Sequence, residues 1–241
     1  MMNSLLKLNE VNTHINQFHI LQGVSLEIPI HQVTVLLGRN GAGKTTTLRT
    51  IMGLTPASKG QVLWQEKDIT ALPTYKIAQL GIGFVPEDQG IFPLLTVAEN
   101  IKIAIQDEND KQTQENLEWI LNIFPDLKIA WKRPAGHLSG GQKQMLSIAR
   151  AFINNNTLLL IDEPSKGLAP IMVHALIEAI QEIKSKTTIL LVEQNFYMAS
   201  RVGETFYILD DGKTVYQGNI KELVENENLK RKHLGIYKKT V

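Results

Sequence analysis

The sequence predicts an α/β fold built around a mostly parallel, buried sheet, and three observations support this prediction. Aliphatic runs recur between helical patterns, as expected of parallel strands covered on both faces, at 33–37, 158–161 and 188–192. The first run leads into Gly38-Arg39-Asn40-Gly41-Ala42-Gly43-Lys44-Thr45, which has the spacing of a phosphate-binding loop. The second run leads directly into two adjacent carboxylates, Asp162 and Glu163.

The phosphate-binding loop lies between a predicted strand, Val33 to Leu37, and a predicted helix, Thr45 to Met52, which Gly53 would cap. Its glycines let backbone N–H groups approach phosphate oxygens at a helix N-terminus, where the dipole favours anions. Lys44 would place its charge between the β- and γ-phosphates, and the Thr45 hydroxyl would ligate Mg²⁺. The predicted nucleotide contacts here are Gly38, Arg39, Asn40, Gly41, Ala42, Gly43, Lys44, Thr45 and Thr46.

Composition limits the classes of function. A length of 241 residues suits one large α/β domain or two small ones, and a net charge of +1 argues against a nucleic-acid or basic membrane-binding surface. The absence of cysteine excludes disulfides and thiolate metal sites and suits a reducing compartment. We find neither a signal-peptide pattern at the N-terminus nor an apolar run near the roughly 20 residues of a membrane-spanning helix.

The N-terminal region alternates apolar and polar residues over Leu5 to Asn12 and again over Leu21 to Ile28, before a turn at Pro29. We expect two strands of an antiparallel flap beside the main sheet. His14, Phe18 and His19 lie in the connection and are candidates for stacking on a nucleotide base, although solvated loop side chains explain them equally well.

The next segment contains a turn at Ser58-Lys59-Gly60, a short strand at Gln61 to Leu63 and a helix from Pro73 to Gln79. A strand at Ile82 to Val85 then leads to Glu87. Ligands of open α/β sheets bind at the carboxyl ends of the strands, so Glu87 is placed to face Mg²⁺ and the γ-phosphate. A solvated loop carboxylate is the alternative interpretation.

A helical segment interrupts the α/β pattern between Leu94 and His137. Thr96 to Glu99 has the pattern of a capping box, and apolar residues within Gln114 to Phe124 recur at helical spacing, after a charged linker at Asp107 to Gln112. We therefore expect one domain, 1–241, with an α/β core of 1–87 and 157–241 and an inserted helical subdomain of 88–156.

A second potential anion site follows at Ser139-Gly140-Gly141-Gln142. Ser139 is a good N-cap, and the glycines expose backbone N–H groups at a helix N-terminus. The helix has one apolar face, formed by Met145, Ile148, Ala149 and Phe152. A Ser-Gly-Gly turn before a helix is common, so this motif is only moderately specific by itself.

Asp162 and Glu163 end an aliphatic strand, where two carboxylates are expensive to desolvate without a positive partner. A magnesium nucleotide would supply that charge: Asp162 would hold Mg²⁺ through water, and Glu163 would polarise the attacking water. Gln194, after the strand Thr188 to Val192, could reach the γ-phosphate. The remaining predicted elements are a helix at Val173 to Ile183, a hairpin of Phe206 to Leu209 with Thr214 to Tyr216, and a helix from Ile220 to Val224.

Together these motifs resemble the ATP-binding cassette ATPases over nearly the whole chain, from about Lys7 to Gly235. The phosphate loop, Leu138-Ser139-Gly140-Gly141-Gln142 and Leu158-Leu159-Leu160-Ile161-Asp162-Glu163-Pro164 occur in that family's order and spacing. A finer similarity, to the smaller ATPase subunit of branched-chain amino acid importers, is carried by Val85 to Glu87, Ile91 to Pro93, Ser165 to Pro170, Leu191 to Asn195 and His233 to Gly235.

The resemblance implies a P-loop NTPase fold and a transport mechanism. Two cassettes, identical or related, would meet head to tail and bind ATP and Mg²⁺ between the phosphate loop of one and the Ser139–Gln142 segment of the other. ATP closure and hydrolysis would drive a membrane permease through the loop from Glu87 and the helical subdomain. The chain would lie peripherally on the cytoplasmic face of the plasma membrane, and a solute-binding protein would deliver the cargo.

Several positions depart from the general cassette pattern. Glu87 replaces a glutamine near magnesium, Gln194 replaces a histidine near the γ-phosphate, Ala169 replaces an aspartate, and Ile15 falls where an aromatic residue stacks on adenine. The finer subfamily has similar exchanges, but they leave the roles of Glu87 and Gln194 open, since glutamine does not carry a proton near neutral pH.

Other functions are compatible with parts of the pattern. The same ATPase could serve urea, short amides or a lipid, including in export. A soluble cassette acting on DNA or the ribosome would usually have two cassettes, a coiled-coil insertion or basic extensions, and this near-neutral chain has none of these patterns. A phosphate-loop kinase would have no use for the Leu-Ser-Gly-Gly-Gln element.

Overall fold

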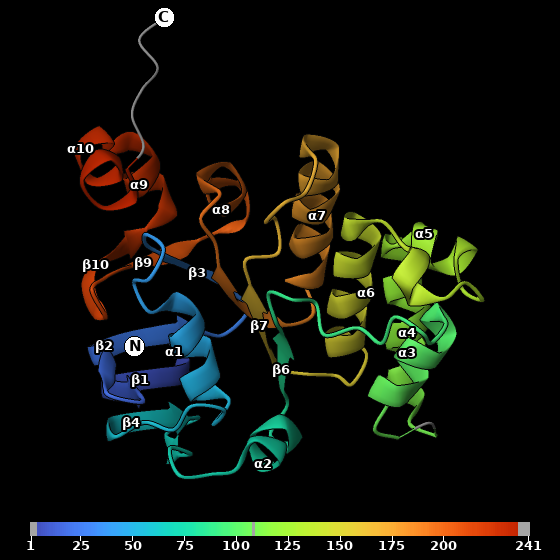
Figure 1. The fold of residues 1–241 in the computed structure, drawn as a ribbon, viewed down its shortest axis with the longest axis horizontal. Helices are drawn as coiled ribbons and strands as arrows, with labels where there is room; N and C mark the ends of the chain where they lie inside the picture. Colours follow the sequence, from blue (N-terminus) through green and yellow to red (C-terminus); the bar gives the residue numbers. More distant parts are fainter. Residues whose placement is uncertain (1–3, 108, 236–241) are drawn as a thin grey trace, which may run out of the picture.

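The computed structural model describes residues 4–107 and 109–235 and contains two sheets (Figure 1). The antiparallel sheet has the order β2-β1-β4-β5 and consists of β1 (Ser4–Ile15), β2 (Phe18–Pro29), β4 (Lys59–Trp64) and β5 (Lys67–Asp68). The second sheet has the order β10-β9-β3-β8-β7-β6 and is parallel except for the β9–β10 hairpin. Its strands are β3 (Val33–Leu37), β6 (Ile82–Val85), β7 (Leu158–Asp162), β8 (Thr188–Val192), β9 (Thr205–Asp210) and β10 (Lys213–Asn219).

The central strands are buried on both faces, which explains their continuous aliphatic sequences. In β3, Val33, Val35 and Leu37 pack into one apolar core, and Leu36 packs into the other. Strands β7 and β8 alternate in the same way. This alternation follows from the two-residue period of a strand and places the sheet between two layers.

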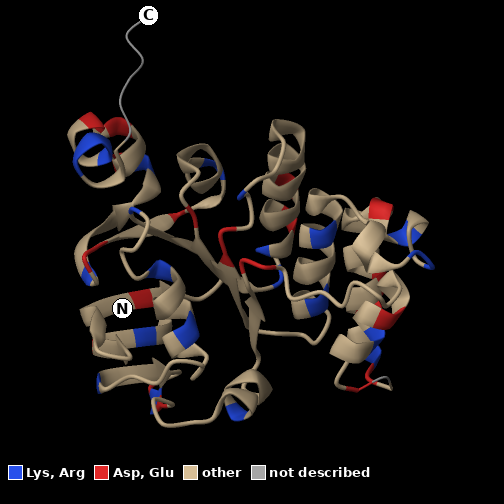
Figure 2. Cartoon of the chain, in the orientation of Figure 1, with Lys and Arg blue, Asp and Glu red and all other residues tan. Residues whose placement is uncertain are grey.

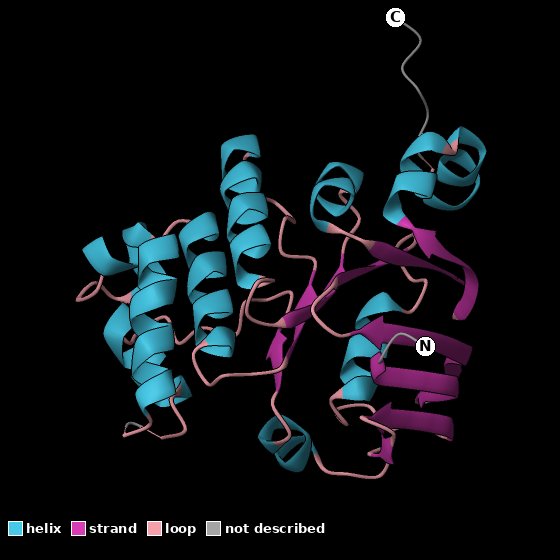
Figure 3. Cartoon of the chain, turned by 180° about the vertical axis from the view of Figure 1, so that it is seen from behind, coloured by secondary structure: helices cyan, strands magenta, loops and turns pink. Residues whose placement is uncertain are grey.

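The helices complete these two layers. Helices α1 (Lys44–Ile51) and α2 (Thr74–Gln79) share a core with the antiparallel sheet. The opposite core takes the remaining helices, which are α3 (Val97–Ala104), α4 (Lys111–Ile123), α5 (Pro125–Ile129), η1 (Ala135–His137), α6 (Gly140–Phe152), α7 (Pro170–Ile183), α8 (Phe196–Val202), α9 (Ile220–Glu225), α10 (Glu227–Leu229) and the π-helical turn η2 (Lys230–Leu234). Figure 3 shows α3 to α6 gathered at the opposite end of the molecule from the antiparallel sheet. Within the described ranges, no helix is both long and apolar enough to cross a membrane.

The fold prediction is confirmed in its main features: an α/β architecture with a mostly parallel sheet, an antiparallel flap and a helical insertion. The predicted capping box at Thr96 forms, and Ser139 is the N-cap of α6 as predicted, where it also forms a capping box with Gln142. The central strands 33–37, 82–85 and 188–192 have the predicted bounds.

Three local predictions are wrong. Strand β1 continues to Ile15 and β2 begins at Phe18, so His14, Phe18 and His19 lie in paired strands and not in a connection. The predicted turn at Ser58-Lys59-Gly60 is largely strand, because β4 begins at Lys59 and pairs with β1 across an irregular register. Gly60 serves a close approach in this strand, since a Cβ there would lie 2.3 Å from the carbonyl oxygen of Glu10. The predicted linker 107–112, of which residue 108 lies outside the described ranges, ends early: Asp110 accepts a hydrogen bond from the Thr113 N–H (3.0 Å) and starts α4 at Lys111.

Candidate nucleotide-binding and catalytic site

The carboxyl ends of β3, β7 and β8 meet at one cavity of about 280 Å³, as expected of a parallel sheet. Figure 2 shows acidic segments meeting in this central region of the fold. The cavity is lined by Ile20, Asn40, Gly41, Gly43, Lys44, Thr45, Thr46, Glu163, Lys166 and Gln194. The structure therefore brings most of the predicted phosphate loop together with predicted residues from two other strand ends.

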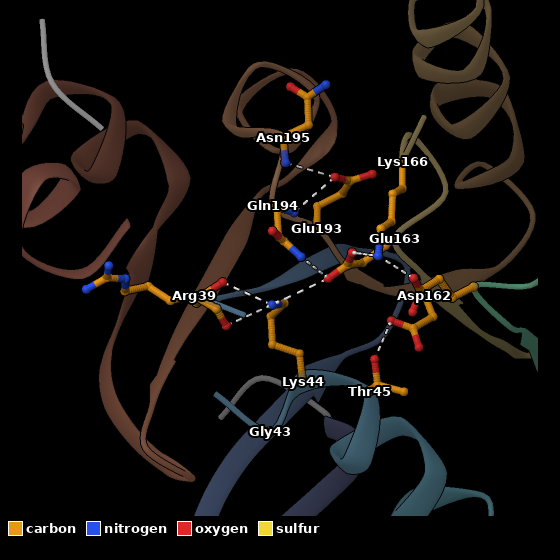
Figure 4. Close-up of polar contacts among 12 residues, drawn as sticks. Arg39, Gly43, Lys44, Thr45, Asp162, Glu163, Lys166, Glu193, Gln194 and Asn195 are labelled. Atoms are coloured by element: carbon orange, nitrogen blue, oxygen red, sulfur yellow. Dashed lines mark hydrogen bonds and ion pairs between the residues drawn. The ribbon is translucent and has the colours of Figure 1, made fainter. Parts of the chain in front are cut away.

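The phosphate loop is tightly packed between β2 and β9. A Cβ on Gly38, whose φ is +149°, would lie 2.4 Å from the carbonyl oxygen of Leu209, and a Cβ on Gly43, whose φ is +103°, would lie 2.8 Å from the Leu21 side chain. Both positions therefore require glycine. Within the loop, Ala42 is buried, and Figure 4 shows the Arg39 side chain directed away from the cavity. These two residues, with Gly38, contribute backbone rather than side chains to the loop.

Lys44 is the buried cation of the cavity. Its Nζ donates hydrogen bonds to the carbonyl oxygens of Gly38 (3.0 Å) and Arg39 (3.2 Å) and lies 3.5 Å from Glu163 Oε1 (Figure 4). The ammonium group is thus held inside the loop, where an incoming phosphate oxygen would meet a positive charge that is already desolvated.

Thr45 and Asp162 form an incomplete cation site. Thr45 Oγ1 donates to Asp162 Oδ1 at 3.2 Å, whereas Asp162 Oδ2 is buried and has no hydrogen-bond partner among the described residues. Burial raises the pKa of Asp162 from 3.8 to about 6, against the lowering effect of the Thr45 hydrogen bond. An orphaned carboxylate oxygen beside a hydroxyl fits Mg²⁺, which commonly combines one or two carboxylates with substrate phosphates.

This burial predicts a pH-dependent stability. The folded Asp162 carboxyl binds its proton more tightly than the unfolded one, so the nucleotide-free protein loses stability as the pH rises from about 4 to about 6. We expect Asp162→Asn to raise the free energy of unfolding by up to about 3 kcal/mol at pH 7 and by roughly half of that at pH 5. Urea unfolding at the two pH values measures this difference.

Asp68→Asn is the control for this prediction. Hydrogen bonds from Thr70 lower the pKa of Asp68, so this substitution should not stabilise the protein, and its effect should have the opposite pH dependence. Equal effects of Asp162→Asn at pH 5 and pH 7 would contradict the raised pKa.

Glu163, predicted to polarise the attacking water, and Gln194, predicted to reach the γ-phosphate as a second catalytic residue, are in direct contact. Gln194 Nε2 donates to Glu163 Oε1 at 2.5 Å, and Glu163 is buried with its backbone in the left-handed region (φ +44°). The turn after β7 thereby directs the carboxylate toward Lys44. A buried carboxylate at the phosphate end of the cavity has the placement required of a base for the attacking water.

Glu193 is a positioning residue that sequence reasoning missed. Its carboxylate is buried and accepts N–H hydrogen bonds from Gln194 and Asn195, each at 3.0 Å (Figure 4). It also accepts one from the Ser165 N–H at 3.0 Å. It therefore ties the loop after β8 to the loop after β7. An acidic residue next to Gln194 was the only signal in the sequence, and it does not reveal the long-range contact with Ser165.

Glu87 lines an adjoining hollow of about 250 Å³ together with Thr45 and Asp162. Its partner is Lys166, a residue to which the sequence analysis assigned no role: Lys166 Nζ lies 2.5 Å from Glu87 Oε1. The hydrogen bond to Glu87 raises the pKa of Lys166, which is therefore charged at neutral pH. Whether Glu87 faces a metal stays a prediction.

The Ser139–Gln142 segment lies apart from this cavity. Ser139 Oγ accepts from the Gln142 N–H (3.3 Å), and Gln142 Oε1 accepts from the Ser139 N–H (3.1 Å), so both side chains cap α6. Ser139 and Gly140 are exposed, whereas Gly141 is buried against Met172. None of the four is among the described residues that line the cavity. The chain therefore presents a second helix N-terminus to solvent.

The candidates for base stacking lie in the β1–β2 hairpin. His14 and His19 face each other across the strands, with ring centroids 4.2 Å apart and nearly parallel planes. His14 also bonds Ser58, and His19 bonds Asn12, while Phe18 stays largely exposed. Ile20 is the only member of this hairpin among the described residues that line the cavity. The role of His14 in base stacking stays a prediction.

Comparison with known proteins gives consistent results. The family model described as ABC transporter matches residues 21–166. The chain is 35% identical to the probable branched-chain amino acid transport ATP-binding protein LivF of Archaeoglobus fulgidus, over 96% of this chain and 99% of the relative. It is also 35% identical to BraG of Pseudomonas aeruginosa, a high-affinity branched-chain amino acid transport ATP-binding protein, over 96% of this chain and 100% of BraG. Its identity to the lipopolysaccharide export system ATP-binding protein LptB of Escherichia coli is 31%, over 90% of this chain and 91% of LptB.

Solved structures of the same fold include a nucleotide-free ATP-binding cassette from an ABC transporter. It has a TM-score of 0.83 and 25% identity, over 98% of this chain and 100% of that one. The ADP conformation of an ATP-binding cassette of an ABC transporter has a TM-score of 0.80 and 26% identity, over 92% of this chain and 95% of that one.

Proposed function

Because this chain belongs to the ABC transporter family and is an ATP-hydrolysing subunit of a transporter, we propose that it drives the import of branched-chain amino acids. The observation that carries the proposed chemistry is the convergence of Lys44, Asp162, Glu163 and Gln194 at one cavity. The substrate assignment rests on the similarity to LivF and BraG over almost their full lengths.

Each residue has a distinct role in the proposed reaction. The N–H groups of the phosphate loop and Lys44 bind the phosphates, and Thr45 and Asp162, with Glu87 beside them, would hold Mg²⁺, which supplies charge that offsets the phosphate oxygens. Glu163 takes a proton from the attacking water. Gln194 donates a hydrogen bond to Glu163 and orients it, while Glu193 fixes the backbone that carries Gln194.

We infer that the working unit is a head-to-tail pair of cassettes, formed with a second copy or a related subunit. The exposed capping box of Ser139 and Gln142 supports this, because a helix N-terminus outside its own cavity suits a phosphate bound to a partner. Hydrolysis would then require both chains.

A permease contact is supported by the segment between Glu87 and α3. Phe92 and Leu94 are exposed there, and helix α6 holds the same segment, since Ser147 donates to the Gln89 carbonyl oxygen and Arg150 to that of Gly90. Movement of the helical subdomain, 88–156, relative to the core would thus move this loop. In this arrangement the chain lies at the cytoplasmic face of the plasma membrane, and a solute-binding protein delivers the transported molecule to the permease.

Uptake of labelled leucine and urea by host cells that lack this chain tests the proposed substrate. We expect the wild-type chain, but not Glu163→Gln, to restore leucine uptake to deficient cells. An intact leucine uptake in the deficient cells would contradict the branched-chain assignment, and a urea defect would name a replacement.

A further inference from the structure

Lys166 is a cation inside the catalytic region that the reaction described above does not use. It follows Glu163 by one tight turn, in which the Lys166 N–H donates to the Glu163 carbonyl oxygen at 3.1 Å. This turn directs the side chain across the cavity mouth, where its Nζ lies 2.5 Å from Glu87 Oε1 and 3.8 Å from Glu163 Oε2 (Figure 4).

The position of this ammonium group bears on the cation site. Glu87, Thr45 and Asp162 line one hollow, and Lys166 lines the neighbouring phosphate cavity with Thr45 and Glu163. Lys166 therefore reaches from one hollow to the other and pairs with Glu87, the carboxylate that lines the first hollow together with Asp162. A divalent cation bound between Thr45 and Asp162 would bring a second positive charge to the same carboxylate.

We propose that Lys166 is a positioning residue that holds Glu87 in the nucleotide-free protein and is displaced from it by magnesium-bound nucleotide. This inference rests on the proposed role of Glu87 beside Mg²⁺. The ion pair therefore opposes the binding of nucleotide with its metal, which must break the pair, whereas metal-free nucleotide leaves it intact.

The solvent exposure of the Lys166–Glu87 ion pair sets how strongly its loss should change nucleotide affinity. The side chains of Lys166 and Glu87 are 60% and 42% exposed, and ion pairs in such positions contribute modestly. Loss of the pair should tighten binding of magnesium-bound nucleotide about two- to fivefold. Binding of metal-free nucleotide should not tighten, because it gains nothing from a free Glu87 and loses a nearby positive charge.

The experiment measures the affinity of a fluorescent non-hydrolysable ATP analogue, once with saturating Mg²⁺ and once with EDTA. The ratio of interest is the affinity with Mg²⁺ divided by the affinity with EDTA. We expect Lys166→Met to raise this ratio about two- to fivefold over wild type. Lys166→Arg, which can keep the ion pair, should match wild type. The matched control is Lys7→Met, which removes a 2.9 Å ion pair with Glu66 in the antiparallel sheet and should leave the ratio unchanged.

The Glu87→Gln background identifies the carboxylate on which Lys166 acts. There, Lys166→Met should no longer change the ratio, and a change of the same size would overturn the proposal. An unchanged or lower ratio for Lys166→Met in the wild-type background would also overturn it. Wild-type protein whose affinity does not depend on Mg²⁺ would instead contradict the proposed metal site, so the two failures are distinguishable.

Discussion

Glu163→Gln will bind ATP and lose its hydrolysis, with a fall in kcat of about 10²–10⁴-fold or more. The substitution preserves the shape of the side chain and an oxygen that accepts the Gln194 hydrogen bond. It removes the group that takes the proton from water. It also removes a negative charge 3.5 Å from Lys44 Nζ, so ATP affinity should be equal to or higher than that of wild type.

Steady-state phosphate release and equilibrium ATP binding, measured on the same preparation, separate these two effects. Glu182→Gln is a suitable control, since it removes an exposed carboxylate from α7 and should leave both quantities unchanged. Hydrolysis by Glu163→Gln at a rate near that of wild type would remove Glu163 from the role of base. Loss of ATP binding would show that its charge is needed to hold Lys44 in place.

The core of this site was predictable because its signals are local. The phosphate loop is a contiguous motif, and Asp162 and Glu163 directly follow a buried strand, so the parallel sheet alone brings their strand ends together. The same logic placed Gln194 at the end of β8, where the structure shows it in contact with Glu163.

The contacts that the sequence did not reveal join distant loops. Lys166 reaches Glu87, 79 positions away, and Glu193 accepts from Ser165, 28 positions away. Such pairs depend on how each loop turns after its strand, which no periodicity records. Gly60 illustrates the same limit, because a glycine that signals a turn in sequence instead permits a close approach between β4 and Glu10.

Ser139→Arg, introduced into Glu163→Gln, will abolish the ATP-dependent dimer that the single variant forms. Ser139 is exposed at the N-terminus of α6 and lies outside the phosphate cavity of its own chain. A large side chain there would fill the space that the proposed shared site gives to the partner's γ-phosphate. Light scattering after size exclusion, with and without ATP, measures the loss.

Thr96→Arg in the same background separates a damaged helix cap from a blocked interface. Thr96 caps α3 with the same geometry, since its Oγ1 accepts from the Glu99 N–H at 3.2 Å and Glu99 Oε2 accepts from its N–H at 2.7 Å. Both substitutions therefore forfeit a cap worth about 1 kcal/mol, but only Ser139→Arg should prevent dimerisation. Both double variants should still bind ATP as monomers, because the phosphate loop is intact. A dimer that survives Ser139→Arg would contradict a nucleotide site shared between two chains.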